Sequence, residues 1–457
     1  MLVDEMASRL VAYRRTGLEK ELHSTLIPLI IDLVAVTVSG AATATSNRLR
    51  RAVEISDGDG RCTVIGTPFR ASAKDAALAN GTSAHAEDFD DFNEAFGGHP
   101  TVAVLPALLV LAEARGKSGA DVIRAYVAGV EAESRLADAV HFHHYEKGWH
   151  PTSTLGVFGA AAGAADLLDL PAKETATALS IAASLASGIK SNFGADTKPL
   201  HAGHCNQSGL MAALLAEQGF TAGDATLEGP QGFFEVYNGA GNYEVERLLT
   251  DWFDVPKIID PGVSIKQFPC CGSTHAAIYA AFELHNAGCP APSDIERVQV
   301  QMHPRRLPHT DTPNPRTPLD AKFSVQYVTA RALATGRIGS ADFAPGAYDQ
   351  GEIAALTQRV NARPSEVYAA RSDRGFAAQV TVTDKQGHSV THEYLKPPGR
   401  GPGNPMTDAE LKLKFDDCAS QALTGAGGKS AFQMLTQFEA LDDLRPLHAA
   451  LCDVKVA

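Results

Sequence analysis

The strongest constraint on the fold of this 457-residue chain is a segment that is apolar on every side. Residues 101–114 read TVAVLPALLVLAEA, so a helix over them would carry apolar side chains around nearly its whole circumference. Such a helix is stable only when other elements cover all of its faces. The segment therefore predicts a central helix surrounded by other helices.

Helical periodicity extends along most of the first half of the chain. Leu26, Ile30 and Leu33 recur at spacings of three and four residues, as on the buried face of a helix. Similar patterns predict helices over 119–142, 152–168, 172–187 and 200–219. Residues 1–261 are therefore expected to be mostly helical.

The pattern changes after residue 261. Val298, Val300 and Met302 alternate with polar residues, which is the period of a half-buried strand. A second alternating run ends at the turn-like residues 384–387, and a further strand over 388–395 completes a hairpin. This part of the chain is expected to contain a small sheet.

The expected fold class is mainly α, with two domains. Single cores rarely grow past roughly 250–300 residues, so two domains suit the length. Helices at 273–287 and 320–336 would accompany the strands, and the Pro/Gly-rich run at 396–405 has the composition of a linker. We expect a large all-α helical domain of residues 1–261 and 398–457, plus a smaller α+β lid domain of residues 262–397.

Composition excludes several classes of partner. The net charge is −13, which argues against binding nucleic acid or an anionic membrane. The most apolar stretches, 26–38 and 102–111, are too short or too interrupted to span a membrane, and the N-terminus lacks the apolar core of a signal peptide. The seven cysteines form no CxxC motif, so reduced thiols in a cytoplasmic protein are expected.

Three polar residues stand before a proline at predicted helix starts: His99, His150 and Lys198. Proline is favoured in the first turn of a helix, and the residue before it avoids the helical region. These side chains should therefore lie at the mouths of their helices. Residues 273–275, Ser-Thr-His, resemble a cap that opens a fourth helix.

Helix N-termini carry positive partial charge and unpaired N–H groups, so several of them around one cavity would bind carboxylates. The same field disfavours an imidazolium and would keep a histidine available as a neutral base. Lys198 would add a fixed cation. The alternative is that each proline marks an ordinary helix boundary without a catalytic role.

A second signal is the run HAEDFDDFNEAFGGHP at 85–100. His85 and Asp88 are three residues apart and would share a helix face. A carboxylate here could orient a histidine. Alternatively, His85, Asp88, Asp90 and Asp91 could bind a divalent metal in a metal-dependent hydrolase, or the run could be a solvated acidic helix end.

Five segments in the same order resemble the MmgE/PrpD family, and together they extend over essentially the whole chain: 85–113, 148–170, 192–221, 266–281 and 321–338. The family is known for methylcitrate dehydratase, cis-aconitate decarboxylase and iminodisuccinate epimerase. The resemblance implies an all-α domain with an α+β lid, a site between them, a homodimer, and neither metal nor cofactor.

The resemblance also assigns site residues. Catalytic positions would be Asp88, His99, His150, Lys198, His275 and Tyr327, and substrate-binding candidates are Tyr145, Thr152, Lys266 and Asp91. No residue is assigned to a metal. Phe92 departs from the pattern, because decarboxylase-like members have threonine there, and the gap to His99 is one residue longer.

These enzymes share one difficult step, the transfer of a proton at a carbon next to a carboxylate. Lys198 would hold the carboxylate and the charge that develops on it. His150 or His275 would be the base, His99 oriented by Asp88 would be the acid, and the Tyr327 hydroxyl would contact the substrate.

The expected activity is a lyase that acts on a small di- or tricarboxylate, with a methylcitrate dehydratase-like reaction placed first. A cis-aconitate decarboxylase-like reaction and an isomerase are alternatives, since GWHPTSTLG at 148–156 also resembles the epimerase. Two alternatives belong to other functional classes: the metal-dependent hydrolase and a non-catalytic binding protein. The expected partners are the small anionic carboxylate and a second copy of the chain.

Overall fold

The computed structural model describes residues 1–16, 22–56, 60–370 and 375–455. These form two compact units, residues 1–265 with 407–457 (unit 1) and residues 266–406 (unit 2). The sequence placed the corresponding breaks after residues 261 and 397. Unit 1 is helical and unit 2 contains a small mixed sheet, so the predicted fold class is confirmed.

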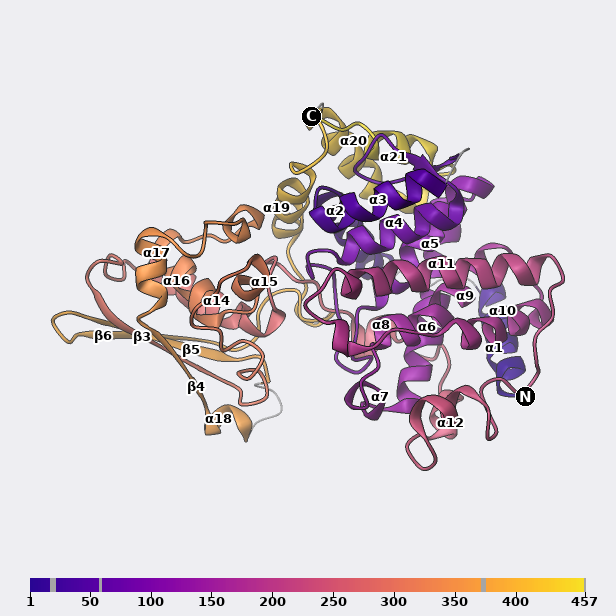
Figure 1. Cartoon of the computed structure of the whole chain (residues 1–457), viewed down its shortest axis with the longest axis horizontal. Coiled ribbons are helices and arrows are strands. Elements are labelled where there is room, and N and C mark those ends of the chain that lie inside the picture. Colours follow the sequence, from indigo (N-terminus) through magenta and orange to yellow (C-terminus); the bar gives the residue numbers. More distant parts are fainter. Residues whose placement is uncertain (17–21, 57–59, 371–374, 456–457) are drawn as a thin grey trace. The chain divides into compact units, whose positions relative to one another are not determined.

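Unit 1 is built almost entirely from helices (Figure 1). They are α1 (Leu2–Thr16), α2 (His23–Ala41), α3 (Ala44–Ser56), α4 (Ala73–His85), α5 (Pro100–Arg115), α6 (Gly119–Val140), α7 (His143–Glu146), α8 (Pro151–Thr154), α9 (Gly156–Leu167), α10 (Ala172–Leu185), α11 (Thr197–Glu217), α12 (Phe233–Asn238), α13 (Val245–Leu248), α19 (Asp408–Ala419), α20 (Gly425–Leu435) and α21 (Arg445–Leu451). Shorter elements are β1 (Cys62–Thr63) paired antiparallel with β2 (Arg70–Ala71), and the helical turns η2 (Lys190–Asn192), η3 (Ile258–Gly262) and η7 (Phe438–Ala440).

Helix α5 is the central helix that the sequence predicted. Every residue from Pro100 to Ala112 is buried, and α2, α4, α6, α9 and α11 pack around it. Pro100 occupies the first helical position, where its missing N–H costs no hydrogen bond. Gly116 ends the helix in the left-handed region, with φ of 64°.

Helices α4 and α11 approach each other so closely that one contact position excludes a side chain. A Cβ added to Gly203 of α11 would lie 2.1 Å from Thr82 Oγ1 and 2.3 Å from Leu78 O, both on α4. Only glycine fits this contact. The contact brings the C-terminal end of α4 beside the N-terminal end of α11.

The C-terminal helices return to unit 1. Helices α19 and α20 pack against α2, as the yellow and indigo segments of Figure 1 show. Lys414 of α19 forms a buried ion pair with Asp32 and donates to the Phe89 carbonyl at 3.0 Å. Helix α2 has the length and hydropathy of a membrane span, but 78% of its Ser24–Ala41 window is buried inside the unit, as in a core helix.

Unit 2 combines a four-stranded sheet with short helices. Its elements are η4 (Gly272–Thr274), α14 (His275–Asn286), β3 (Ile295–Met302), α15 (Pro318–Lys322), α16 (Val325–Thr335), η5 (Ser340–Phe343), α17 (Gly351–Thr357), β4 (Val360–Pro364), α18 (Glu366–Ala369), β5 (Ala378–Asp384) and β6 (Ser389–Tyr394). The strand order is β4-β3-β5-β6, with β4 parallel to β3 and the other pairs antiparallel.

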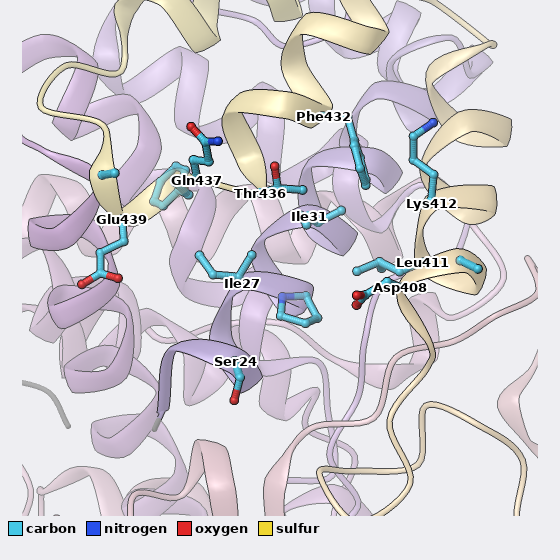
Figure 2. A pocket seen from close by; sticks show the side chains of 14 residues that line it. Ser24, Ile27, Ile31, Asp408, Leu411, Lys412, Phe432, Thr436, Gln437 and Glu439 are labelled. Carbon is cyan, nitrogen blue, oxygen red and sulfur yellow. The ribbon is translucent and has the colours of Figure 1, made fainter. Parts of the chain in front are cut away.

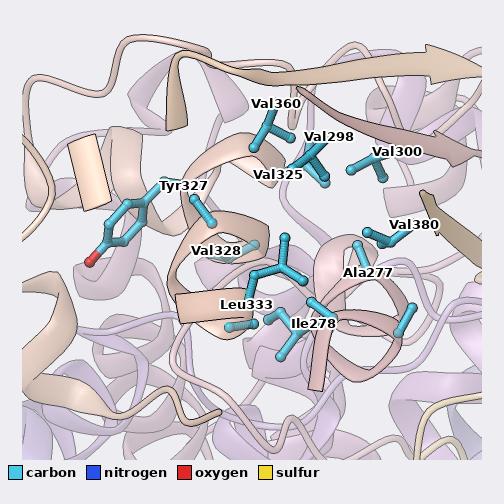
Figure 3. Packing of buried hydrophobic residues seen from close by; sticks show 14 of the residues in the cluster. Ala277, Ile278, Val298, Val300, Val325, Tyr327, Val328, Leu333, Val360 and Val380 are labelled. Carbon is cyan, nitrogen blue, oxygen red and sulfur yellow. The ribbon is translucent and has the colours of Figure 1, made fainter. Parts of the chain in front are cut away.

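The predicted strand and hairpin are confirmed as β3, β5 and β6, whereas β4 was missed. Its sequence, VNARP, has one buried apolar residue and ends in proline, so it shows no alternation. Helices α14 and α16 cover one face of the sheet (Figure 1). Val298 and Val380 of the sheet pack there against Ile278 of α14 and Val328 of α16 (Figure 3).

Two predicted helices are each two helices in the structure. The segment expected at 152–168 is broken at Leu155, and the one at 320–336 is broken after Lys322. In the second case the Ser324 hydroxyl accepts from the Tyr327 N–H at 3.0 Å and starts a new helix. Continuous apolar spacing concealed both breaks.

Candidate functional site

Four helix ends of unit 1 bring polar side chains together. His85 is the last residue of α4, His99 and His150 precede α5 and α8, and Lys198 lies in the first turn of α11. The His85 ring centroid lies 4.5 Å from that of His99 and 5.9 Å from that of His150. We call His85, Asp88, Asp90, His99, His150 and Lys198 the histidine cluster.

The predicted helix-mouth positions are confirmed for two of the three residues. His99 and His150 are extended, with φ of −117° and −98°, and each is followed by proline at the first helical position. Lys198 differs, because α11 already begins at Thr197 and Lys198 is helical. Proline at the third position still lies in the first turn, where its missing N–H breaks no helical hydrogen bond.

Asp88 lies outside any helix, which corrects the expected shared helix face with His85. Helix α4 ends at His85, and Asp88 takes a left-handed conformation with φ of 54°. Residues other than glycine seldom adopt this conformation, and such strain is concentrated at functional sites. It directs an Asp88 carboxylate oxygen to 2.8 Å from Lys198 Nζ and 3.6 Å from His99 Nε2.

Asp90 connects two histidines inside the cluster. The side chain is fully buried, and its two carboxylate oxygens lie 2.9 and 3.0 Å from His85 Nδ1. One of them also lies 3.1 Å from His99 Nδ1. Asp90 is therefore closer to the His99 ring than Asp88, the residue that was expected to orient His99. The sequence signal was present as the third position of the DFDD run.

Burial keeps two histidines of the cluster, His85 and His150, neutral near pH 7. It lowers the pKa of His85 to about 4, against the opposing effect of Asp90. Burial, followed by the charges of His85 and Lys198, holds the pKa of His150 well below its usual value. A histidine with a lowered pKa was expected from the field of the helix N-termini, whereas burial is the main cause of the lowered pKa of His150. Burial would raise the pKa of Asp90, yet His85 and His99 hold it well below its ordinary range.

His150 has a neighbour that the sequence reasoning missed. His150 Nδ1 lies 3.1 Å from His201 Nδ1, and the exposed Phe193 ring packs edge-on at 4.9 Å from the His150 centroid. His201 is one helical turn beyond Lys198 in the motif TKPLH. That spacing was a usable signal, because residues three apart on a helix share a face.

The candidate substrate-binding residues of unit 1 make internal contacts. The Thr152 hydroxyl accepts from the His99 N–H at 3.1 Å, and the buried Asp91 carboxylate lies 3.4 Å from the Thr101 N–H. The Tyr145 ring lies 3.3 Å below Lys190 Nζ. Thr152 and Asp91 therefore support the backbone around His99, and direct substrate contact by any of the three stays a prediction.

The other candidates belong to unit 2. His275 begins α14 and is fully buried, with Nε2 3.4 Å from the Cys270 carbonyl oxygen. Tyr327 is also fully buried, and its hydroxyl donates to the Asp342 carbonyl. Lys266 is 4% exposed. The roles of these three residues stay predictions. The expected cap at 273–275 is absent, since Thr274 instead donates to Cys271 O at 2.8 Å.

The loop after Asp90 forms a closed turn. Phe92 pairs with Ser264 in an isolated bridge, and the Asn93 N–H donates to Gly98 O at 2.9 Å. The Asn93 side chain accepts from the Phe96 N–H at 2.8 Å and donates to Gly262 O at 2.6 Å. The residue that departs from the family pattern thus lies in an ordered turn.

Part of the cluster also fits a metal ion. His85, Asp88, Asp90 and His99 each offer a ligand atom, and these atoms lie within 4.8 Å of one another. Two imidazoles and two carboxylates suit zinc. The sequence had suggested Asp91 as the fourth ligand, whereas the structure places His99 there. Lys198 Nζ already lies beside Asp88, however, and its charge opposes a second cation there.

A separate pocket of about 860 Å³ lies between α2, α19, α20 and η7 (Figure 2). Ile27, Ile31, Leu411 and Phe432 give it a mostly apolar lining. No residue of the histidine cluster lines it. No histidine lines it, and its two carboxylates, Asp408 and Glu439, are exposed, so the cluster is the better candidate site for proton transfer.

Comparison with known families decides the relationship. The family model for the MmgE/PrpD N-terminal domain matches residues 4–246, and the model for the MmgE/PrpD C-terminal domain matches residues 268–436. The chain belongs to the MmgE/PrpD family. The resemblance read from five sequence segments is thereby confirmed, and the chain is an enzyme of this family with lyases among its relatives.

This MmgE/PrpD enzyme is similar to proteins named as decarboxylases and dehydratases. Cis-aconitate decarboxylase of Mus musculus is 29% identical over 91% of this chain and 86% of its own length. Cis-aconitate decarboxylase of Aspergillus terreus is 27% identical over 93% and 91%. The 2-methylcitrate dehydratase of Escherichia coli strain K12 is 23% identical over 72% of each chain.

Proposed function

We propose that this enzyme is a metal- and cofactor-independent lyase acting on a small di- or tricarboxylate, with cis-aconitate the first substrate to test. The observation that carries the proposal is the histidine cluster, in which three imidazoles lie together beside the Lys198–Asp88 pair. The named decarboxylases align over more of the chain than the named dehydratases do. This reverses the order expected from sequence.

Lys198 supplies the charge that the reaction needs. Breaking a C–C bond to CO2, or removing a proton next to a carboxylate, leaves an electron pair that spreads into the remaining carboxylate. A fixed ammonium stabilises that charge more strongly than mobile water does, and a donor of this kind is worth roughly 3–4 kcal/mol. Asp88 holds the ammonium in place before the substrate arrives.

His150 and His99 are the proton-transfer groups in this proposal. The lowered pKa of His150 leaves it neutral near pH 7, so it can take a proton from carbon. His99 is the acid, and the carboxylates of Asp88 and Asp90 lie 3.6 and 3.1 Å from its two ring nitrogens and fix the orientation of the ring. A positioned acid or base contributes roughly 100- to 10,000-fold.

The experiment is incubation of the pure enzyme in D2O with cis-aconitate, 2-methylcitrate, citrate and iminodisuccinate, followed by proton NMR. Deuterium should enter a carbon next to a carboxylate of one substrate. The product then separates decarboxylation from dehydration and epimerisation. Absence of turnover and exchange with all four acids would contradict the proposal.

The metal-dependent hydrolase remains the second candidate, because the four ligand atoms lie so close together. Elemental analysis and EDTA treatment separate the two readings. The proposed lyase should keep its activity in EDTA. Stoichiometric zinc whose removal abolishes turnover would favour the second candidate. The homodimer and the cytoplasmic location stay predictions, and light scattering of the pure protein tests the first.

A further inference from the structure

The contact between His150 and His201 restricts where each ring carries its proton. The two Nδ1 atoms are 3.1 Å apart, which is a hydrogen-bond distance. A neutral imidazole has one N–H and one lone pair, so one Nδ1 must donate and the other must accept. The tautomers of the two rings are therefore coupled.

The surroundings of His150 indicate the direction of this bond. Among the residues that the structure describes, Nδ1 is the ring nitrogen with a hydrogen-bond partner, and Nε2 has none. A base must present a lone pair to its substrate, so Nε2 has to be the unprotonated nitrogen. The proton of neutral His150 is then on Nδ1, which donates to His201.

His201 is suited to the acceptor role. It is 7% exposed and lies on α11, one turn from Lys198. Burial and the nearby positive charges of His204 and Lys198 lower its pKa, so its ring keeps a lone pair near pH 7. The Ser153 hydroxyl donates to the His201 carbonyl at 3.1 Å and holds the two segments together.

We propose that His201 is a positioning residue that accepts a hydrogen bond from His150 Nδ1 and thereby keeps the lone pair of His150 on Nε2. This inference rests on the proposed function of His150 as the base. When the opposite tautomer forms, Nε2 carries hydrogen and cannot take a proton from carbon. The same contact stabilises the imidazolium that His150 becomes during the reaction.

Three substitutions at one position test the proposal. In His201→Asn the amide oxygen lies near the position of Nδ1 and can still accept the bond. In His201→Gln the amide lies near Nε2, away from His150, and His201→Leu removes the acceptor. Loss of an outer-shell partner typically costs 10- to 100-fold. We expect that loss in kcat for the Gln and Leu variants, little change in KM, and wild-type kcat within about fivefold for Asn.

His204→Gln is the matched control. His204 is on the same helix, lies 3.3 Å from Ser187 Oγ, and is outside the histidine cluster. Its activity should stay at the wild-type level. Equal kcat in wild type, His201→Gln and His201→Leu would overturn the proposal, as would an equal loss in the Asn, Gln and Leu variants.

A second measurement does not depend on turnover. NMR of the full-length protein with 15N-labelled histidine reports which ring nitrogen carries hydrogen, and a His150→Gln sample assigns the signals. We expect hydrogen on Nδ1 of His150 in wild type and its redistribution in His201→Leu. Hydrogen on Nε2 in wild type would overturn the proposal. If no carboxylate is turned over but Nδ1 carries hydrogen, the proposed function has failed and the positioning contact stands.

Discussion

Lys198 Nζ lies 2.8 Å from Asp88 Oδ1, although 110 positions separate the two residues. The contact joins the first turn of α11 to a loop residue whose left-handed backbone places its carboxylate there. The pair places one carboxylate of the protein where a carboxylate of the substrate is expected to bind. When the substrate binds, its carboxylate would then replace the Asp88 carboxylate beside the Lys198 ammonium.

Replacing Lys198 by Met tests this role. The variant removes the charge, so turnover should fall at least about 100-fold, in line with the loss of one donor to a developing anion. Lys173→Met, on the exposed surface of α10, is the control. In a double-mutant cycle with Asp88→Asn, the two losses should not add, because the residues are in contact. Wild-type kcat/KM in Lys198→Met would remove Lys198 from the mechanism.

Asp90→Asn should impair the enzyme without contact to substrate. The substitution removes the negative charge and turns one of the two oxygens beside His85 Nδ1 into an NH2 donor, which cannot accept from that ring nitrogen. We expect kcat to fall roughly 10- to 100-fold, as for other outer-shell partners. Steady-state kinetics check this, with the exposed Asp224→Asn as the control. An unchanged kcat would show that the orientation of His99 does not depend on Asp90.

The pH dependence of kcat/KM should reflect the low pKa of His150. Burial holds this pKa well below its usual value, so His150 stays neutral when a solvent-exposed histidine would already be protonated. The acid limb of the profile should therefore lie below pH 6.5. A limb centred at or above 6.5 would argue that another group is the base.

Unfolding stability should fall as the solution is acidified. His85 has a folded pKa of about 4, below its value in the unfolded chain, so the unfolded state binds more protons between pH 6.5 and 4. The loss over this window is on the order of 3 kcal/mol at most for this group. Urea midpoints at pH 7.5 and 5 measure it. His85→Asn should show a flatter dependence, and an identical slope would contradict the assignment.

Gly203→Ala should destabilise unit 1. The added methyl group would meet Thr82 Oγ1 and the Leu78 carbonyl at distances well below van der Waals contact. Overpacking of this kind costs roughly 1–3 kcal/mol. Gly425→Ala, at a helical position with open space around it, is the matched control. Equal thermal unfolding midpoints for the two variants would show that α4 and α11 can move apart at low cost.

Features controlled by local rules were predictable from sequence. The burial of α5 followed from its uniformly apolar side chains, and the positions of His99 and His150 followed from the proline after each. Strand β3 followed from its alternation. In each case the deciding interaction lies within a few residues along the chain.

Features that depend on tertiary contacts were not predictable in the same way. The end of α4 at His85 and the left-handed Asp88 place Asp90, rather than Asp88, against His85. The His150–His201 contact joins segments 51 positions apart and needs the packing of α8 on α11. Strand β4 exists because β3 provides a partner edge for it.

The closed turn from Phe92 to Gly98 has an evolutionary consequence. Asn93 donates to Gly98 O within the turn and to Gly262 O outside it, so the turn is held both by itself and by the segment at Gly262. Insertions or replacements within it would change the chain next to Asp90 and His99 while the helix that follows His99 keeps its position. After gene duplication, such a segment offers a short route to a new substrate within an unchanged set of proton-transfer groups.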